Sequence, residues 1–310
     1  MIVTATAPVR VCDLGGWTDT WFARRGLVVN VAVAPGATAR VTHRPGPVTI
    51  DAPDLPGGPD RLLWAVVEDV GVTADRAIEV TCGVPPGAAM GTSAAVTVAL
   101  LAALGATGDL AARAHAVEVT RLGREGGVQD QVAAARGGVN RIEIDPYPAT
   151  RVTPIAPPPG LDGRLCTVYL GAPHDSAAVH GEVIAAGPHA PVLDRLRAAA
   201  AAGADALQRG DLDGFGRAMV ANTDAQAALA PGVVGVDALA VIALARAHGA
   251  AGWKVNGAGG GGGTVTVLLD RDGARPAFEA AVAAAGYRPL AVALSPDGVR
   301  VTYADVRSTT

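Results

Sequence analysis

Cysteine is scarce in this chain: its 310 residues include three, Cys12, Cys82 and Cys166. They lie far apart and form no C-x-x-C pair, which excludes the usual zinc and dithiol redox motifs. An odd number of widely spaced cysteines is typical of proteins from a reducing compartment. We therefore expect a cytoplasmic location.

Long apolar runs and an excess of positive charge are also missing. The longest apolar run, Ala94–Ala106, is too short to span a bilayer. The first residues, MIVTATAPVRV, alternate like a strand and lack the apolar region of a signal peptide. The net charge of −4 provides no basic surface for nucleic acid. These absences indicate a soluble protein without a membrane or nucleic-acid partner.

Lysine and aromatic residues are rare as well. Lys254 is the single lysine, and aromatic residues make up 4% of the chain. The core must therefore be built mostly from alanine, valine and leucine. A bias toward arginine and alanine codons explains the lack of lysine, but Lys254 also stands just before a glycine-rich stretch.

The order of apolar patterns favours the α+β class. Strands are expected at 2–7, 27–34, 37–43, 47–52, 77–84, 139–145, 164–171, 252–257, 264–270, 288–294 and 299–305. Helices are expected at 60–71 with Asp60 as N-cap, and at 93–104, 109–123, 127–138, 176–186, 191–208, 212–229, 236–248 and 275–285. Because strands and helices do not alternate strictly, a doubly wound α/β sheet is disfavoured.

A proline-dense stretch divides the chain. Residues 146–160 read PYPATRVTPIAPPPG, a composition typical of a domain boundary. The length also suits two domains. We expect an N-terminal domain over residues 1–150 and a C-terminal domain over residues 160–310.

The stretch PPGAAMGTSAA, residues 85–95, connects a predicted strand to an apolar helix. Small residues let backbone approach a ligand, and a helix N-terminus favours an anion such as phosphate. A Walker A loop would need lysine after Gly91, where this chain has Thr92. Backbone N–H groups would then hold the phosphate, with Ser93 near Mg²⁺. A plain turn with Thr92 or Ser93 as N-cap explains the same residues.

Two further stretches carry candidate polar side chains. In PVRVCDLGGWTDTW, residues 8–21, Asp19 would accept hydrogen bonds from sugar hydroxyls and Trp17 would pack on a sugar face. A turn with an Asx cap is the alternative. In GGVQDQVAAARGG, residues 126–138, Asp130 is either a helix N-cap or a carboxylate that orients or deprotonates an attacking hydroxyl.

The fourth stretch is KVNGAGGGGGTVTVLL, residues 254–269. Its five consecutive glycines would suit a flexible linker. The regular structure expected on both sides favours a loop inside a domain instead. Such a loop would allow close approach to a substrate, and Lys254 would add a positive charge.

Together these stretches resemble the GHMP kinase family, which includes galactokinase, homoserine kinase, mevalonate kinase and phosphomevalonate kinase. The resemblance covers nearly the whole chain and rests on three blocks in the expected order: PVRVCDLGGWTDT, PPGAAMGTSAA and NGAGGGGG. GGWTDT, GTS and GGVQDQ are most similar to sugar 1-kinases of the fucokinase and D-glycero-D-manno-heptose 7-phosphate kinase type.

The resemblance implies a two-domain α+β fold, with an N-terminal half like ribosomal protein S5 domain 2 and a ferredoxin-like C-terminal half. ATP and Mg²⁺ would meet the substrate in the cleft between them. The implied reaction transfers the γ-phosphoryl group to a sugar hydroxyl, the anomeric C1 hydroxyl of a heptose 7-phosphate or a fucose-like sugar. The products would be a sugar 1-phosphate and ADP. The partner is a sugar or sugar phosphate, and the protein is a monomer or homodimer.

The resemblance also implies roles for individual residues. Asp130 and Arg10 would be catalytic, and Ser93 and Glu118 would hold Mg²⁺. The ATP phosphates would lie on Pro86, Gly87, Ala88, Ala89, Met90, Gly91, Thr92 and Ser93. The sugar would contact Gly16, Trp17, Thr18, Asp19, Gln129, His174, Asp175, Gly257, Ala258, Gly259 and Gly260.

Two departures from the family pattern bear on the substrate and on ATP. Ala89 stands where the family has glycine, which predicts at most weaker ATP binding. His174, Asp175, Ser176 and His180 replace an arginine-containing segment of the heptose-phosphate kinases, which argues against a phosphorylated substrate. A kinase of a non-sugar alcohol of the mevalonate type, a catalytically silent sugar-sensing relative, and a structural protein remain as alternatives.

Overall fold

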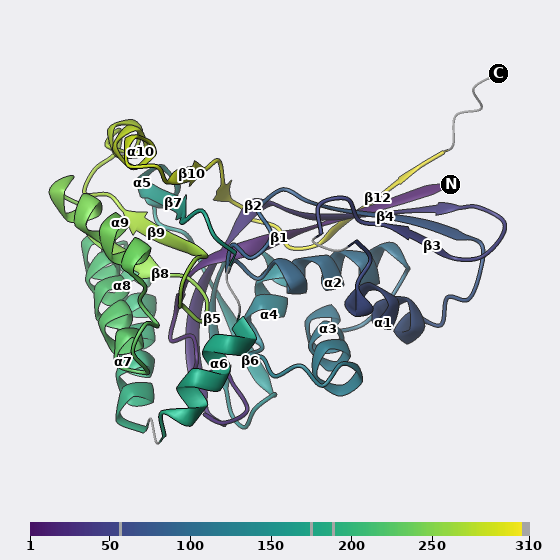
Figure 1. Cartoon of the computed structure of the whole chain (residues 1–310), viewed down its shortest axis with the longest axis horizontal. Helices are drawn as coiled ribbons and strands as arrows, with labels where there is room; N and C mark the ends of the chain where they lie inside the picture. Colours follow the sequence, from purple (N-terminus) through teal and green to yellow (C-terminus); the bar gives the residue numbers. More distant parts are fainter. Residues whose placement is uncertain (56–57, 174–175, 188–189, 306–310) are drawn as a thin grey trace.

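The computed structural model describes residues 1–55, 58–173, 176–187 and 190–305, with the backbone alone for residues 176–178. Two sheets lie side by side, each covered by helices (Figure 1). This arrangement confirms the α+β class. The predicted site residues His174 and Asp175 lie outside the described residues.

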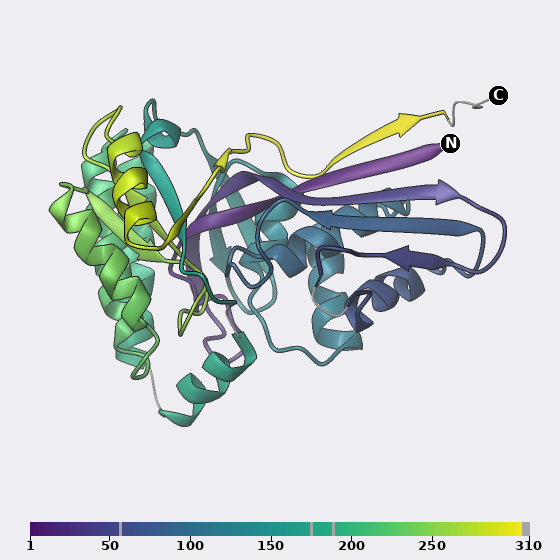
Figure 2. The same ribbon diagram turned by 45° about the horizontal axis from the view of Figure 1, so that its top comes forward.

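Within the described residues the first sheet has eight strands. They are β1 (Ile2–Leu14), β2 (Gly26–His43), β3 (Thr49–Asp51), β4 (Arg76–Cys82), β5 (Val139–Ile144), β6 (Thr150–Ile155), β11 (Ala293–Leu294) and β12 (Arg300–Ala304). Their pairing is antiparallel except for β3 with β4. The last strand, β12, returns to pair with β1, so Ala304 lies opposite Ile2 (Figure 2).

Strand β2 is one strand of 18 residues, where the sequence predicts two strands separated by Pro35 and Gly36. The prediction of a break is wrong because the register of β1 and β2 shifts here, from Ala7 opposite Ala37 to Val9 opposite Val33. Proline has no backbone N–H for the ladder. In a bulge no ladder hydrogen bond is required at this position, so the strand continues through Pro35.

Strand β6 lies inside the proline-rich stretch that the sequence predicts as a boundary. It pairs with β5 alone, and its Pro154 is tolerated because an edge strand leaves one side of its backbone unpaired. The chain passes to the second sheet only after β6. The segment proposed as the C-terminal domain also contributes β11 and β12 to the first sheet.

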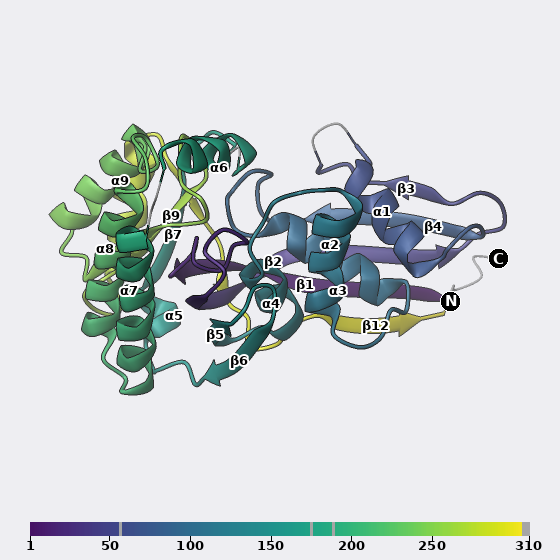
Figure 3. The same ribbon diagram turned by 90° about the horizontal axis from the view of Figure 1, so that it is seen from below.

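Helices cover one face of the first sheet (Figure 3). They are α1 (Arg61–Val70), α2 (Thr92–Ala103), α3 (Leu110–Ala116), the π-helical turn η1 (Val117–Arg121) and α4 (Gln129–Arg136). Helix α2 is buried from Ala94 to Ala103, as its uniformly apolar sequence predicts. Asp60 caps α1 through Leu62 N–H and Leu63 N–H, which confirms the predicted N-cap.

The second sheet is antiparallel with the order β10-β7-β9-β8. Its strands are β7 (Leu165–Tyr169), β8 (Gly252–Val255), β9 (Thr264–Leu268) and β10 (Arg288–Leu290). The helices of this half are α5 (Leu161–Arg164), α6 (Ser176–Ala185), α7 (Ala190–Gln208), α8 (Leu212–Ala227), α9 (Val236–Ala247) and α10 (Arg275–Ala284). The two halves meet where the Cys12 N–H of β1 donates to Asn256 Oδ1, at 3.0 Å.

Candidate active site

A cleft of about 660 Å³ lies between the helices of the first half and the loops of the second. It gathers residues from β1, the loop before α2, η1, α4, α6 and the glycine-rich loop after β8. The predicted residues that line it are Arg10, Trp17, Asp19, Gly87, Ala89, Met90, Gly91, Thr92, Ser93, Glu118, Gln129, Asp130, Gly257 and Ala258.

The loop before α2 is shaped to receive an anion. The carbonyl oxygens of three successive residues face protein donors: Ala88 O accepts from Thr264 Oγ1 at 2.8 Å, Ala89 O from the Arg10 guanidinium, and Met90 O from Arg10 N–H at 2.9 Å. These carbonyl oxygens, which would repel a phosphate, are therefore hydrogen-bonded to protein donors. Helix α2 then begins after Gly91, and the N–H groups of its first turn have no helical partner. These groups can bind phosphate oxygens.

Ala89 adopts a left-handed backbone with φ of +57°, a conformation that costs a residue with a Cβ about 1 kcal/mol or more. We predict that Ala89→Gly stabilises the protein by about 1 kcal/mol because glycine adopts this conformation without strain. The measurement is a thermal melt. The matched control is Ala95→Gly inside α2, which should lower stability by about 1 kcal/mol. Destabilisation by both changes would contradict the prediction.

Arg10 and Asp130 form the central ion pair of the cleft. Arg10 Nε lies 2.8 Å from Asp130 Oδ1, and Nη2 lies 3.2 Å from Oδ2. Burial tends to lower the pKa of Arg10, but the carboxylates of Asp130, Asp13 and Asp19 outweigh it and raise that pKa. Arg10 thus stays charged and fixes the orientation of Asp130.

Asp130 lies directly against the loop that precedes α2. A Cβ added to Gly91 would lie 3.1 Å from the carboxyl carbon of Asp130. Asp130 is the second residue of α4, whose N-cap is Val128, so the alternative interpretation of Asp130 as an N-cap is wrong. Its carboxylate does not cap the helix, and the side chain is 29% exposed at the cleft.

Asp19 is the group that caps α4. Its Oδ2 accepts from Val128 N–H at 3.0 Å and from Gln129 N–H at 3.2 Å. Burial, assisted by the charge of Asp130, raises the pKa of Asp19 to about 6. Asp19 remains mainly ionised at neutral pH and holds the helix that carries Asp130.

Ser93 and Glu118 lie together in the same cleft as Asp130. Ser93 Oγ donates to Glu118 Oε2 at 3.1 Å, and Gln131 Nε2 donates to Glu118 Oε1 at 3.0 Å. Burial raises the pKa of Glu118. A bound cation would favour the ionised carboxylate.

Lys254 does not reach the cleft, contrary to the prediction that it adds charge there. It is fully buried, with Nζ 3.2 Å from Asp13 Oδ1 and 2.9 Å from Gln226 Oε1. Asp13 also accepts from Gly257 N–H, at 3.1 Å to Oδ2. The ion pair joins β1 to β8, and the Gly257 hydrogen bond ties β1 to the glycine-rich loop, which is therefore an ordered loop and not a linker.

Several predicted site residues lie outside the cleft lining. Gly16 and Thr18 shape the turn after β1; Thr18 Oγ1 donates to Gly15 O at 2.7 Å. Gly259 and Gly260 pack against the loop before α9, where Gly260 N–H donates to Val233 O at 2.7 Å. Pro86 and Ala88 support the loop from behind, and Ala88 is fully buried.

The cleft also contains residues that the sequence prediction did not assign to the site: Asp13, Thr20, Gly123, Arg124, Glu125, Gly126, Gly127, Gln131 and His180. Of these, Asp13 had a local signal, because it follows Arg10 by three residues at the end of the same strand. Thr20, Gly126, Gly127 and Gln131 lie in the stretches 8–21 and 126–138 that the sequence already singled out. The remaining residues come from segments whose approach depends on the tertiary fold.

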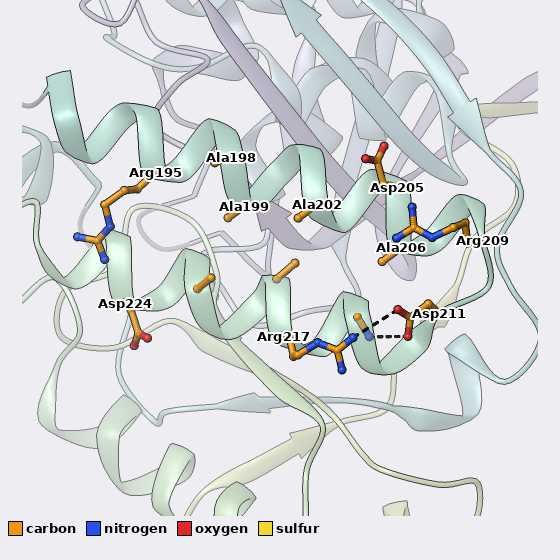
Figure 4. Close-up of a pocket in the computed structure, with 13 residues that line it drawn as sticks. Arg195, Ala198, Ala199, Ala202, Asp205, Ala206, Arg209, Asp211, Arg217 and Asp224 are labelled. Atoms are coloured by element: carbon orange, nitrogen blue, oxygen red, sulfur yellow. Dashed lines mark hydrogen bonds and ion pairs between the residues drawn. The ribbon is translucent and has the colours of Figure 1, made fainter.

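A second hollow, of about 720 Å³, runs between α7 and α8 (Figure 4). Its floor is mostly alanine and its rim carries arginines and aspartates, among them Arg217 and Asp211 at 3.4 Å. None of the predicted site residues lines this hollow. The cleft around Asp130 is therefore the candidate active site.

Two family models match this chain: the GHMP kinase N-terminal domain over residues 60–138 and the GHMP kinase C-terminal domain over residues 204–288. The chain belongs to the GHMP kinase family. The GHMP kinase is accordingly a phosphotransferase that acts on an alcohol group. None of the curated proteins matches the chain.

Solved structures share the fold of this GHMP kinase at low identity. A D-glycero-D-manno-heptose 1-phosphate kinase from Bacteriodes thetaiotaomicron is 20% identical, with TM-score 0.77, over 99% of this chain and 100% of that one. The mevalonate kinase of Methanococcus jannaschii is 15% identical, with TM-score 0.76, over 95% and 98%. Lactococcus lactis galactokinase, solved with galactose, is 17% identical, with TM-score 0.72, over 96% and 95%. In the described part of the chain, no helix has the length and apolar character to cross a membrane.

Proposed function

We propose that this protein is an ATP-dependent sugar kinase that transfers the γ-phosphoryl group of ATP to the anomeric C1 hydroxyl of a sugar. The products are a sugar 1-phosphate and ADP. The observation that carries the proposal is the Arg10–Asp130 ion pair, at 2.8 Å, directly beside the anion-binding loop before α2. The free thiols of Cys12, Cys82 and Cys166 suit the cytoplasmic location that we include in the proposal.

The chemistry needs few groups because phosphoryl transfer depends mainly on positioning and charge neutralisation. The acceptor oxygen attacks the γ-phosphorus while the bond to the bridging β–γ oxygen breaks. Asp130 orients the hydroxyl and accepts its proton. Arg10 holds Asp130 in place and offsets negative charge beside the loop, whose N–H groups bind the phosphate oxygens.

The residues near Glu118 fit Mg²⁺. No cluster of three or more His, Cys, Asp or Glu side chains that could hold a metal occurs among the described residues, but Mg²⁺ on a nucleotide needs only one or two protein ligands beside phosphates and water. Ser93 and Glu118 would supply them. Thr92 precedes Ser93 in the sequence, and Gln131 donates to Glu118. The buried Thr92 Oγ1 and Gln131 Oε1 have no hydrogen-bond partner, so the pocket favours a polar ligand. When bound, Mg²⁺ neutralises phosphate charge.

The decisive experiment measures ADP release with Mg-ATP and a panel of fucose, galactose, mannose, heptose 7-phosphate, uronic acids and mevalonate, with the phosphorylated carbon assigned by NMR. We expect turnover with a sugar and a product phosphorylated at C1. Turnover with mevalonate alone would identify a non-sugar alcohol kinase. Absence of ADP release with every compound would overturn the proposal.

A thermal melt separates a kinase from a structural protein without a known acceptor. A ligand at 100 times its Kd stabilises the folded state by about 2.7 kcal/mol. We therefore predict a clear rise in Tm with saturating Mg-ATP. Glu118→Gln should lower the affinity for Mg-ATP by roughly tenfold or more, the loss expected when the surroundings of a metal ion are disturbed. The rise in Tm at a fixed concentration of Mg-ATP should then be smaller. An unchanged Tm in the wild-type protein would contradict nucleotide binding.

A further inference from the structure

Buried polar atoms without partners gather at the cleft. Among the described residues, the buried side-chain nitrogen and oxygen atoms that lack a hydrogen bond are Trp17 Nε1, Thr92 Oγ1 and Gln131 Oε1. All three residues line the cleft. A buried donor or acceptor without a partner is unfavourable, so this distribution indicates polar groups of a ligand. Thr92 begins α2 and Gln131 donates to Glu118, so both belong to the proposed nucleotide and Mg²⁺ site, whereas Trp17 belongs to the turn after β1.

The acceptor wall is the side of the cleft formed by Asp13, Trp17, Asp19, Thr20, Gln129 and His180. Trp17 is 5% exposed and has a left-handed backbone with φ of +79°. A bulky residue in this conformation is strained, and such strain is concentrated at functional sites. The ring of His180 lies edge-on to Trp17, with 5.0 Å between ring centroids. Trp17 is thus held rigidly with an indole N–H that lacks an acceptor.

The fixed charges of the acceptor wall are negative. Asp13 and Asp19 are 1% and 2% exposed. Lys254 neutralises Asp13, but Asp19 is held by the N–H groups of Val128 and Gln129 without a cation. A substrate phosphate or carboxylate placed at this wall would be repelled by Asp19, because the negative charge of Asp130 is balanced by Arg10.

The cations near the acceptor wall are each paired with a carboxylate. Arg10 is bound by Asp130, and Lys254 is buried behind Asp13. Arg124 lines the cleft outside the acceptor wall, where its charge acts on Glu118, and it forms an exposed pair with Asp60 at 3.4 Å. Burial lowers the pKa of His180, which favours its neutral form. Within the described part of the wall, no unpaired cation is present to bind an anionic substituent.

We propose that the acceptor is an uncharged sugar, without phosphate or carboxylate groups, and that the Trp17 indole N–H binds one of its oxygens. This inference rests on the proposed kinase function. Asp19 and Gln129 carry the acceptor and amide groups that hydroxyls require. The substrate class therefore differs from that of kinases that phosphorylate a sugar phosphate.

The test compares matched acceptors with Mg-ATP: galactose, galactose 6-phosphate and galacturonic acid, and the corresponding mannose and fucose-type compounds. We expect kcat/KM for the best neutral sugar to exceed that of its phosphorylated and carboxylated analogues by at least about 100-fold. A higher value for a charged sugar would overturn this inference while leaving the kinase function intact. No turnover with any acceptor would overturn the kinase function, and this inference with it.

Trp17→Phe keeps an aromatic ring but removes the donor. We expect KM for the neutral sugar to rise about tenfold, the loss typical of one hydrogen bond, with an unchanged KM for ATP. The matched control is Trp21→Phe. The ring centroids of Trp21 and His180 are 5.8 Å apart, but Trp21 does not line the cleft. An unchanged sugar KM in Trp17→Phe would remove Trp17 from the proposed contact.

Asp19→Asn tests the role of charge. Asparagine can still accept the N–H groups that cap α4, but the negative charge is lost. We expect the inhibition constant of the matched uronic acid to fall about tenfold, the effect of removing one like charge at close range. An unchanged inhibition constant would show that Asp19 does not exclude anions.

Discussion

Asp130→Asn is expected to lower kcat by about 10²–10⁴-fold, the contribution typical of a general base, while the affinity for ATP stays nearly unchanged. Asparagine keeps the size and one acceptor oxygen of Asp130 but cannot take the proton of the acceptor hydroxyl. The loss should therefore appear in kcat. The measurements are steady-state ADP release and a thermal melt with Mg-ATP.

The control for this variant removes a carboxylate elsewhere. Asp109 caps α3 by accepting Ala112 N–H at 3.1 Å, and asparagine is an equally good cap. Asp109→Asn should leave kcat within about twofold because it lies at no catalytic position. A wild-type kcat in Asp130→Asn would show that Asp130 does not act on the acceptor.

Local features of the site could be predicted from the sequence because they depend on neighbouring residues. The loop before α2 is an example: the strand before it and the apolar helix after it were predicted from the sequence, while the backbone anion site between them stays a prediction. Helix α2 itself, Thr92–Ala103, lies within one residue of the expected range. These features follow from propensity and periodicity.

Features that join distant segments could not be predicted in this way. Arg10 and Asp130 are 120 positions apart, and only the family resemblance brought them together. The sequence motif around Asp19 suggested a local turn, but its carboxylate caps α4, more than 100 positions away. Neither contact leaves a trace in spacing or composition, because each depends on how β1 packs against the helices.

The single lysine shows this limit most clearly. Its position before the glycine-rich loop suggested a charge for phosphate. The structure instead buries Lys254 with Asp13, each side chain 1% exposed. Burial lowers the pKa of Lys254, and the charge of Asp13 partly opposes that shift. The pair is structural, because it joins β1 to β8 in the interior.

Lys254→Met should therefore destabilise the protein by about 3–5 kcal/mol, because it leaves the buried Asp13 carboxylate without its cation. Methionine fills similar space, so the loss would come from charge and not from a cavity. The measurement is urea unfolding, read as a change in midpoint with the slope held constant. A loss below about 1 kcal/mol, the range of a surface ion pair, would contradict the assignment.

A double-mutant cycle separates the ion pair from the other contacts of Asp13. Asp13→Leu alone leaves the Lys254 ammonium buried and should cost about as much as Lys254→Met. With both changes no charge remains buried, so the double variant should be less destabilised than the sum of the single variants by about 1–3 kcal/mol. The recovery should be incomplete, because Gly257 N–H and the Gln129 amide also donate to Asp13. Additive losses would mean that Lys254 and Asp13 stabilise the fold independently.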